Sequence, residues 1–311
     1  MAEHMSSKIV TCVSYHHFER SPSVFTRHLG VSTSPEAFAQ QLTYFKRHYT
    51  PVSLDQLLQG DLPDNPLLLT IDDSYRSTLE IAAPMLTDAG IPALLMPNSR
   101  VIEGGYAPID NVLSLAMSEL GPTGLGIAVG LADPWTCGVR RIVREIMPAL
   151  DVARREELKQ RFLKLLNVRE ADLVERMDLF LDPAQLKRLV TEHGFSAGSH
   201  TATHMHLRAL SRDAARAEIA EGKRRVEDMT GAKVRAFSFP YGSPLDATPA
   251  NLDLVRDCGH EAIFLVQRRT NAIRAASDIW YRQGMSEQLG LQLPVKLTWL
   301  PRMGELKAAL N

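Results

Sequence analysis

Two adjacent carboxylates stand at the end of an apolar run in the segment LLLTIDDSYRST, residues 67–78. The run has the composition of a buried strand, yet Asp72 and Asp73 place two like charges where that strand should end. Adjacent aspartates are also common in turns, so the pair alone indicates little. In a parallel α/β sheet, however, ligands bind at the carboxyl ends of the strands. The pair is therefore a candidate metal-binding or acid–base site.

Two histidines follow a second apolar run, in FSAGSHTATHMH. His200 and His204 are four residues apart, a spacing that puts two imidazoles on one side of a helical turn. An isolated HxxxH pair often reflects packing or surface histidines instead. Together with one carboxylate from the other strand end, the pair would leave coordination positions open for water and substrate. His206 extends the cluster to HxxxHxH, and we expect it on the rim or surface of the site.

Strand-like and helix-like patterns alternate along the chain. Short apolar runs occur in KIVTCVSYHH, LLLTIDDS, IPALLMPNS, FSAGSH, VRAFSFPYG and HEAIFLV. Segments of helical period lie between them, at 35–47, 75–89, 183–192, 212–229 and 248–258. Capping residues mark helix starts in SPEAF, DPAQL, SRDAA and TPANL. The alternation predicts an α/β fold with a parallel sheet.

Residues 104–182 break this alternation, because they are largely helical in pattern. We interpret them as an α-helical insertion within a single catalytic domain spanning residues 1–311. This insertion could form a lid that narrows the cleft. The glycine-rich stretch GPTGLGIAVG inside the insertion lacks the strand–turn–helix context of a dinucleotide fingerprint, and we expect a loop there. The segment 283–311 has no identifiable chemistry.

Composition excludes several classes of function. The 311 residues are 45% hydrophobic, which is enough for a sizeable core. A net charge of −1 supplies no field for nucleic acid or anionic lipid, and no apolar run has the length of a membrane span. Three scattered cysteines argue against a disulfide framework. We therefore expect a cytoplasmic protein without nucleic-acid or membrane partners, unless a leader once preceded Met5; the oligomeric state stays open.

Taken in order, three segments resemble the motifs of the polysaccharide deacetylase (NodB-homology) family. LTIDDSY resembles the family's TFDDG, GSHTATH resembles H(S/T)xxH, and FSFPYG resembles the FAYPYG form of the third motif. The connecting segments SPEAFAQQL, PVSLDQLL and AGIPALL are similar as well, so the resemblance extends from about Ile9 to Gly284. It implies a distorted (β/α) barrel and a metal-dependent hydrolase that removes an N-acetyl or other small N-acyl group from an amino sugar or a sugar-containing intermediate.

The resemblance also implies residue roles. A divalent metal, zinc first and cobalt, nickel, iron or manganese as alternatives, would be held by Asp73, His200 and His204. Asp72 would be the general base. The cation would keep Asp72 ionised beside Asp73, where two bare carboxylates would repel each other and one would take up a proton.

A general acid is needed to protonate the leaving amine. The family's C-terminal LLHD-like motif is missing, but VSYHHF resembles the branch acting on poly-N-acetylglucosamine, which has a histidine after its first strand. This nominates His16, since His17 would point to the opposite face. By the same resemblance the backbone N–H of Tyr241 would stabilise the oxyanion, and Pro240 and Ser74 would contact the substrate.

Two departures from the family pattern bear on the substrate. Ser74 replaces the glycine of DDG, and Ser238 stands where the RxPY form has an arginine that supports the catalytic aspartate. We expect a small-molecule or oligosaccharide N-acylated substrate. A cytoplasmic enzyme would more naturally act on a soluble N-acylated sugar, a nucleotide sugar or a natural-product intermediate than on a wall or matrix polymer. Two other interpretations remain: a non-haem iron oxygenase, whose facial triad has the same ligand types, and a catalytically silent glycan-binding member of the family.

Overall fold

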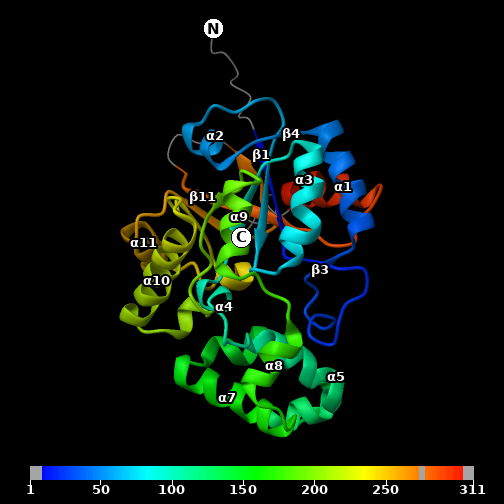
Figure 1. Ribbon diagram of the computed structural model, residues 1–311, viewed down its shortest axis with the longest axis vertical. Helices are drawn as coiled ribbons and strands as arrows, with labels where there is room; N and C mark the ends of the chain where they lie inside the picture. The colour runs from blue at the N-terminus through cyan, green and yellow to red at the C-terminus, as the bar shows by residue number, and fades with distance from the viewer. Residues whose placement is uncertain (1–8, 273–276, 304–311) are drawn as a thin grey trace.

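A parallel sheet forms the centre of the protein in the computed structural model, which describes residues 9–272 and 277–303 (Figure 1). Neighbouring strands pair in the order β7-β6-β5-β1-β11-β9-β8, and each of these pairings is parallel. The strands are β1 (Ile9–Tyr15), β5 (Pro66–Asp72), β6 (Ala93–Met96), β7 (Ser196–Ala197), β8 (Ala236–Ser238), β9 (Ala262–Val266) and β11 (Ile279–Gly284). A parallel bridge between Ser199 and Phe237 joins the two ends of this path. The sheet is therefore a distorted, nearly closed barrel, which confirms the expected fold class.

Short strands complete the sheet. β4 (Thr50–Pro51) pairs with β5, and β10 (Asn271–Ala272) runs antiparallel to β1. A separate pair consists of β2 (His17–Phe18) and β3 (Ser32–Thr33).

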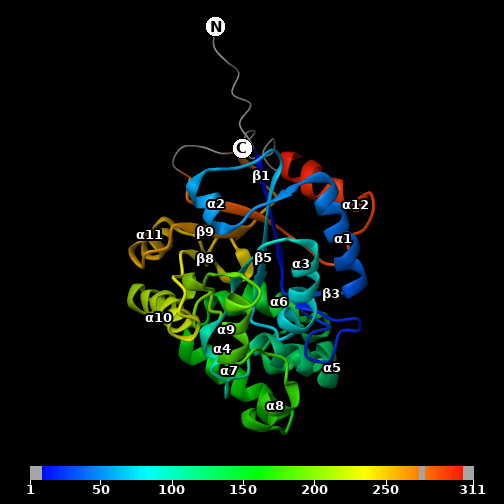
Figure 2. The same cartoon turned by 45° about the horizontal axis from the view of Figure 1, so that its top comes forward.

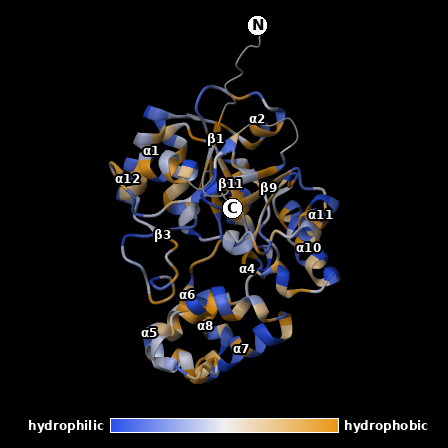
Figure 3. Cartoon of the chain, turned by 180° about the vertical axis from the view of Figure 1, so that it is seen from behind, coloured by the Kyte–Doolittle hydropathy of each residue, from blue (hydrophilic) through white to orange (hydrophobic). Residues whose placement is uncertain are grey.

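The apolar strand β5 lies at the core of the barrel, and each of its residues is buried. Its pairing with β1 aligns Tyr15 with Ile71, so both strands end at the same edge. The residues that follow these ends, His16 and the Asp72–Asp73 pair, therefore emerge together. In Figure 3 the central strands are drawn largely in hydrophobic orange, and blue is concentrated on the outer helices.

Helices cover the outside of the barrel, and the four predicted helix starts are confirmed. The side chains of Ser34, Asp182, Ser211 and Thr248 each accept a hydrogen bond from a backbone N–H of the first turn. These caps begin α1 (Pro35–His48), α9 (Pro183–Thr191), α10 (Arg212–Thr230) and α11 (Pro249–Asp257). The other covering segments are α2 (Leu54–Gln59), η1 (Thr78–Ala82), α3 (Ala83–Ala89), α12 (Gln292–Pro294) and η7 (Val295–Trp299).

The helical insertion lies at one end of the barrel (Figures 1 and 2). Between β6 and α9 come α4 (Ser99–Ile102), α5 (Ile109–Ala128), η2 (Pro134–Thr136), α6 (Val139–Arg141), η3 (Ile142–Ile146), η4 (Met147–Ala149), α7 (Val152–Leu165) and α8 (Glu170–Met177). Apart from α4, whose Ile102 packs in the core of the barrel, these elements pack around a second hydrophobic cluster that includes Val112, Ile142 and Phe162.

Two expectations about secondary structure were wrong. Most of the glycine-rich stretch is helical, because it forms the second half of α5 beyond a kink at Gly121 and Pro122. The φ of 66° at Gly121 is a conformation that glycine adopts without steric cost, which lets the helix change direction there. The second error was the omission of β11, which pairs with both β1 and β9. None of the helices in the described ranges combines the length and apolar character that a membrane crossing requires.

Candidate metal centre and active site

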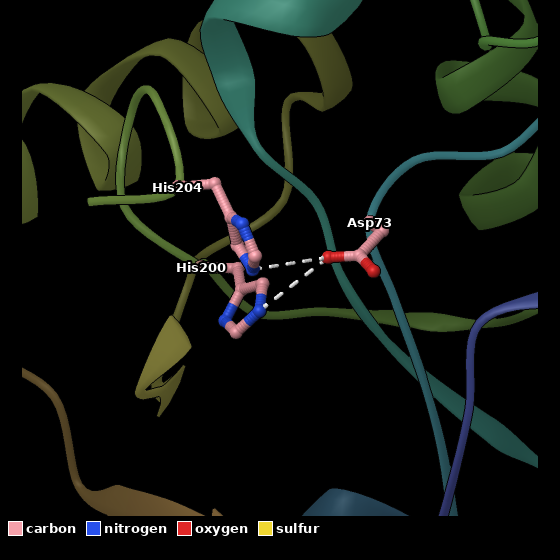
Figure 4. A group of neighbouring side chains, drawn as sticks. All are labelled: Asp73, His200 and His204. Atoms are coloured by element: carbon pink, nitrogen blue, oxygen red, sulfur yellow. Dashed lines mark ion pairs between the residues drawn. The ribbon is translucent and has the colours of Figure 1, made fainter. Parts of the chain in front are cut away.

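Asp73, His200 and His204 converge on one point (Figure 4). The Oδ1 atom of Asp73 lies 3.6 Å from Nε2 of His200 and 3.5 Å from Nε2 of His204. That same Oδ1 is buried and has no hydrogen-bond partner among the described residues. A buried carboxylate oxygen facing two imidazole nitrogens is an arrangement that a bound cation would satisfy.

The backbone brings these ligands together from distant parts of the sequence. Asp73 directly follows β5, whereas His200 and His204 lie in the loop after β7. Asp73 and His204 have φ values of 70° and 60°, a region that residues with a side chain seldom adopt. Strained backbone of this kind concentrates at functional sites, where the surrounding structure enforces it. Here the hydroxyl of Thr201 accepts a hydrogen bond from the backbone N–H of His204 and holds the loop in this shape.

Each histidine is oriented by a hydrogen bond from its other ring nitrogen. His200 donates from Nδ1 to the carbonyl of Ser238 at 2.7 Å, and His204 donates from Nδ1 to Asp110 at 2.9 Å. Both Nε2 atoms are therefore left as lone-pair donors toward Asp73, as in proteins whose metal-binding histidines have such partners. Tetrahedral coordination with bonds of about 2.1 Å would set ligand atoms about 3.4 Å apart, close to the spacing found here. The three residues fit a divalent ion such as zinc.

Asp72 is buried beside this group and is held by an arginine. The carboxylate accepts two hydrogen bonds from Arg282 of β11, at 2.7 and 2.8 Å. Arg282 is fully buried and also donates to Thr70 and to the hydroxyl of Ser238. Although Ser238 occupies the arginine position of the family's third motif, an arginine from another strand therefore supports Asp72. The sequence interpretation missed Arg282 because it did not predict the strand β11, on which this residue lies.

These contacts set the charges of the site. Burial alone would raise the pKa of Asp72, but Arg282 and His200 lower it to about 2, so this carboxylate is ionised at neutral pH. Burial lowers the pKa of His200 to about 4, which favours the neutral imidazole that a metal ligand requires. Burial also acts to lower the pKa of His204, but Asp73 and Asp110 outweigh it and raise that pKa above the usual value.

The two adjacent histidines after β1 have different surroundings. His16 lines the cavity above the metal group, and its buried Nδ1 has no hydrogen-bond partner in the described part of the chain. His17 is buried on the other side, where Nδ1 lies 2.8 Å from the hydroxyl of Ser77 and Nε2 lies 3.2 Å from Glu19. Of the pair, only His16 is therefore positioned to meet a substrate in the cavity.

Tyr241 lies in the turn η6 (Pro240–Gly242), with a φ of 61°. Its hydroxyl donates to Asp110, and its ring stacks on His206 with ring centres 4.0 Å apart. Pro240, which begins this turn, is buried and is not among the residues that line the main cavity.

Ser74, which we expected to contact the substrate, is not among the residues that line the main cavity. Its side chain has a structural contact. Its hydroxyl accepts a hydrogen bond from the backbone N–H of Asn98, and it lines a small separate pocket together with Ile71 and Leu95. Ser74 has a φ of 64°, a conformation that glycine adopts without steric cost, which explains why the family motif has a glycine at this position. The Asn98 side chain in turn donates to the carbonyl of His200, so this serine supports the metal-binding loop indirectly.

The helical insertion contributes to the site, which the sequence did not reveal. Asp110 comes from the first turn of α5, and Arg155 comes from α7. Arg155 is buried and donates to the carbonyl of His204 at 2.6 Å. His206, which we expected on the rim or surface, is only 3% exposed. It is covered because Nδ1 contacts Asp246 and Nε2 donates to the carbonyl of Val143 in the insertion.

A cavity of about 990 Å³ opens above the metal group, at the upper end of the range for ligand sites. Asp72, Asp73, His16, His200, His204 and Tyr241 all line it. Residues of the insertion, among them Val139 and Phe180, form one wall of it.

A family model described as polysaccharide deacetylase matches residues 59–263, more than half of the chain. The chain belongs to the polysaccharide deacetylase family. His16 and Arg282 both lie outside the matched range. By sequence, no curated protein matches the chain.

Solved structures of this polysaccharide deacetylase fold are similar over almost the whole chain. The Streptococcus pyogenes deacetylase PplD, solved in complex with acetate, is 14% identical with a TM-score of 0.63, covering 94% of this chain and 99% of its own. A de-N-acetylase from Aggregatibacter actinomycetemcomitans is 13% identical with a TM-score of 0.60, covering 91% and 97%. IcaB from Ammonifex degensii is 18% identical with a TM-score of 0.54, covering 90% and 92%. At these identities the likeness establishes the fold.

Proposed function

We propose that this chain is a metal-dependent N-deacetylase that hydrolyses the amide of an N-acetylated or similarly N-acylated amino sugar. The observation that carries the proposal is the convergence of Asp73, His200 and His204 beside an ionised Asp72 at the floor of a large cavity. Membership of the polysaccharide deacetylase family supports the reaction type.

A divalent ion held by Asp73, His200 and His204 would polarise the substrate carbonyl and acidify a water molecule beside it. Zinc suits two histidines and one carboxylate best, and cobalt, nickel, iron and manganese are the alternatives.

The remaining residues divide the proton transfers between them. Asp72 accepts a proton from the attacking water, and Arg282 keeps the carboxylate ionised and aimed for this task. His16 lines the cavity from the neighbouring strand end and donates a proton to the departing amine nitrogen as the C–N bond breaks. The products are the free amine and the carboxylate of the acyl group. We assign the stabilisation of the oxyanion to the backbone N–H of Tyr241, a residue with a positive φ that lines the cavity.

We propose no substrate contact for Ser74 and Pro240. The Ser74 hydroxyl is engaged with Asn98, and Pro240 is buried at the start of η6. Their role in this proposal is to shape the loops that carry Asp73 and Tyr241.

The test is acetate release by the metal-loaded chain from a panel of N-acetylated sugars, with mass spectrometry following the loss of the acyl mass from N-acetylated and N-formylated metabolites. Asp72→Asn should keep the metal and lose about 10²–10⁴-fold in turnover, the range for a general base. Asp228→Asn, an exposed carboxylate on α10, is the matched control and should turn over normally. Acetate release by Asp72→Asn at the wild-type rate would show that the base is assigned wrongly.

Oxygen consumption with ferrous iron, measured beside acetate release, separates two rival functions from this one. A ferrous oxygenase would consume oxygen without releasing acetate, and it has no use for the Asp72–Arg282 pair. A silent glycan-binding member would release nothing from any sugar, even with its metal bound.

We further propose that the enzyme works in the cytoplasm. Cys12, Cys137 and Cys258 are all free thiols, and two of them are buried, which suits a reducing compartment. Fractionation of cells that express the chain tests this, and recovery outside the cytoplasm would contradict it.

A further inference from the structure

The outer part of the cavity is lined by basic side chains. Arg27 comes from the segment between β2 and β3, Arg140 and Arg144 come from the insertion, and Arg208 follows the metal-binding loop. Acidic residues of the same cavity lie at its floor, in the metal group and beside it. The cavity therefore has a basic mouth above an acidic floor.

The insertion presents two of these arginines on one face. Arg140, Val143 and Arg144 all line the cavity, and their spacing of three and four residues places them side by side along the continuous turns of α6 and η3. Arg141 faces away and pairs with Glu145 at 3.3 Å. The carbonyl of Val143 accepts from Nε2 of His206, which fixes this face close to Tyr241 and the metal ligands. Figure 3 shows α6 at the junction between the insertion and the barrel.

The carboxylates at the floor have counter-charges or face the proposed cation, and the arginines at the mouth have neither. Arg282 neutralises Asp72, and His204 pairs with Asp110. Asp73 faces two histidines and would be neutralised by the cation that these three residues would hold. Within residues 9–272 and 277–303, the side chains of Arg140 and Arg144 have no carboxylate within ion-pair distance.

The same holds in those ranges for Arg27, whose Nε donates only to a backbone carbonyl. Arg208 shares Asp246 with His206 at 3.8 Å and is thereby partly neutralised. The uncompensated charge of the cavity is therefore positive and lies at its mouth.

We propose that the N-acylated substrate carries an anionic group, a phosphate or a carboxylate, which Arg140 and Arg144 bind with help from Arg27. This inference rests on the proposed deacetylation, because it adds a substrate class to the same cavity. Guanidinium groups match phosphate and carboxylate oxygens through paired hydrogen bonds. Unpaired positive charge at a cavity mouth also concentrates anionic ligands there. A neutral glycan would gain from neither effect.

The experiment compares matched substrates on the metal-loaded full chain. The neutral probes are N-acetylglucosamine and an N-acetylated chitin tetramer. The phosphate arm is N-acetylglucosamine 1-phosphate and 6-phosphate, and the carboxylate arm is N-acetylmuramic acid. We expect kcat/KM for at least one anionic arm to exceed that of the neutral probes by roughly tenfold or more, the effect of one charged hydrogen-bonded pair. The arm with the higher value identifies the anion.

The variant Arg140→Gln/Arg144→Gln should abolish this preference by raising KM for the anionic probes, since these contacts act in binding. Arg154→Gln is the control, because Arg154 is an exposed arginine of the same insertion that does not line the cavity. Equal or better turnover of the neutral probes by wild type would overturn the anion site and leave the deacetylase intact. If the chain releases no acetate from any probe, calorimetric titration with N-acetylglucosamine 6-phosphate and N-acetylmuramic acid tests the anion site separately. Binding that weakens in the Arg140→Gln/Arg144→Gln variant would support the anion site and contradict the deacetylase. Equal affinity of wild type and variant would overturn the anion site.

Discussion

Replacing Arg282 with methionine should destabilise the protein severely, because the arginine is the counter-ion of a buried charge. Arg282 is fully buried, Asp72 is 2% exposed, and two hydrogen bonds of 2.7 and 2.8 Å join them. Methionine would fill much of the space but leave the Asp72 carboxylate without a partner. Breaking a buried ion pair from one side costs about 3–5 kcal/mol, and we expect that loss in the free energy of unfolding at pH 7. For a chain of this size it corresponds to a fall of roughly 5–8 °C in Tm.

Urea unfolding followed by circular dichroism, with a chelator present to remove the contribution of any metal, measures this loss. The double variant Arg282→Met/Asp72→Asn should recover much of it, since no bare charge then remains in the core. Arg256→Met is the matched control, because Arg256 pairs with Asp278 at the surface, and it should lose less than about 1 kcal/mol. If Arg282→Met is as stable as this control, or if the double variant shows the summed loss of the two single variants, the pair is not coupled as we describe.

Two further predictions concern the supports of the site, which are Asp110 and His260; Nε2 of His260 lies 3.0 Å from the hydroxyl of Ser199, the residue before His200. Asp110→Asn should weaken Zn²⁺ binding by about 10–100-fold in calorimetric titration, because His204 loses the carboxylate that orients it; an unchanged affinity would refute this. Burial lowers the pKa of His260 from 6.5 to about 4, so the unfolded chain takes up a proton first as the pH falls. The stability from this histidine is fully present above pH 6.5 and is lost toward pH 4, by about 3 kcal/mol in all. The variant His260→Gln should therefore lose less stability between pH 6.5 and pH 4 than wild type does. If the urea midpoints of the variant fall with pH as steeply as those of wild type, this prediction is wrong.

The sequence predicted the parts of the site that follow directly from strand ends. Asp72 ends β5, Asp73 follows it, and His200 and His204 lie in the loop after β7, so a parallel sheet brings them to one edge. The choice of His16 over His17 follows from the alternation of side chains along an extended segment, and the two residues do face opposite surroundings.

The residues that the sequence did not predict act across long distances in the chain. Arg282 lies on a strand whose sequence, IWYRQG, lacks a continuous apolar run, so an arginine there reads as a solvent-facing residue. Asp110 has the position of an ordinary acidic residue in the first turn of a helix. His206 is buried by Asp246, Tyr241 and Val143 of the insertion, which lie far from it in the sequence. Each assignment depends on tertiary packing that no local pattern contains.

The most direct test of the metal centre is elemental analysis of the purified chain after incubation with zinc and removal of free metal. We predict about one ion per chain for wild type and Asp72→Asn, and no retained ion for His200→Ala, because a site of this kind needs all three ligands. A wild-type chain without metal, or a His200→Ala chain that holds as much as wild type, would contradict the proposal that Asp73, His200 and His204 bind one cation.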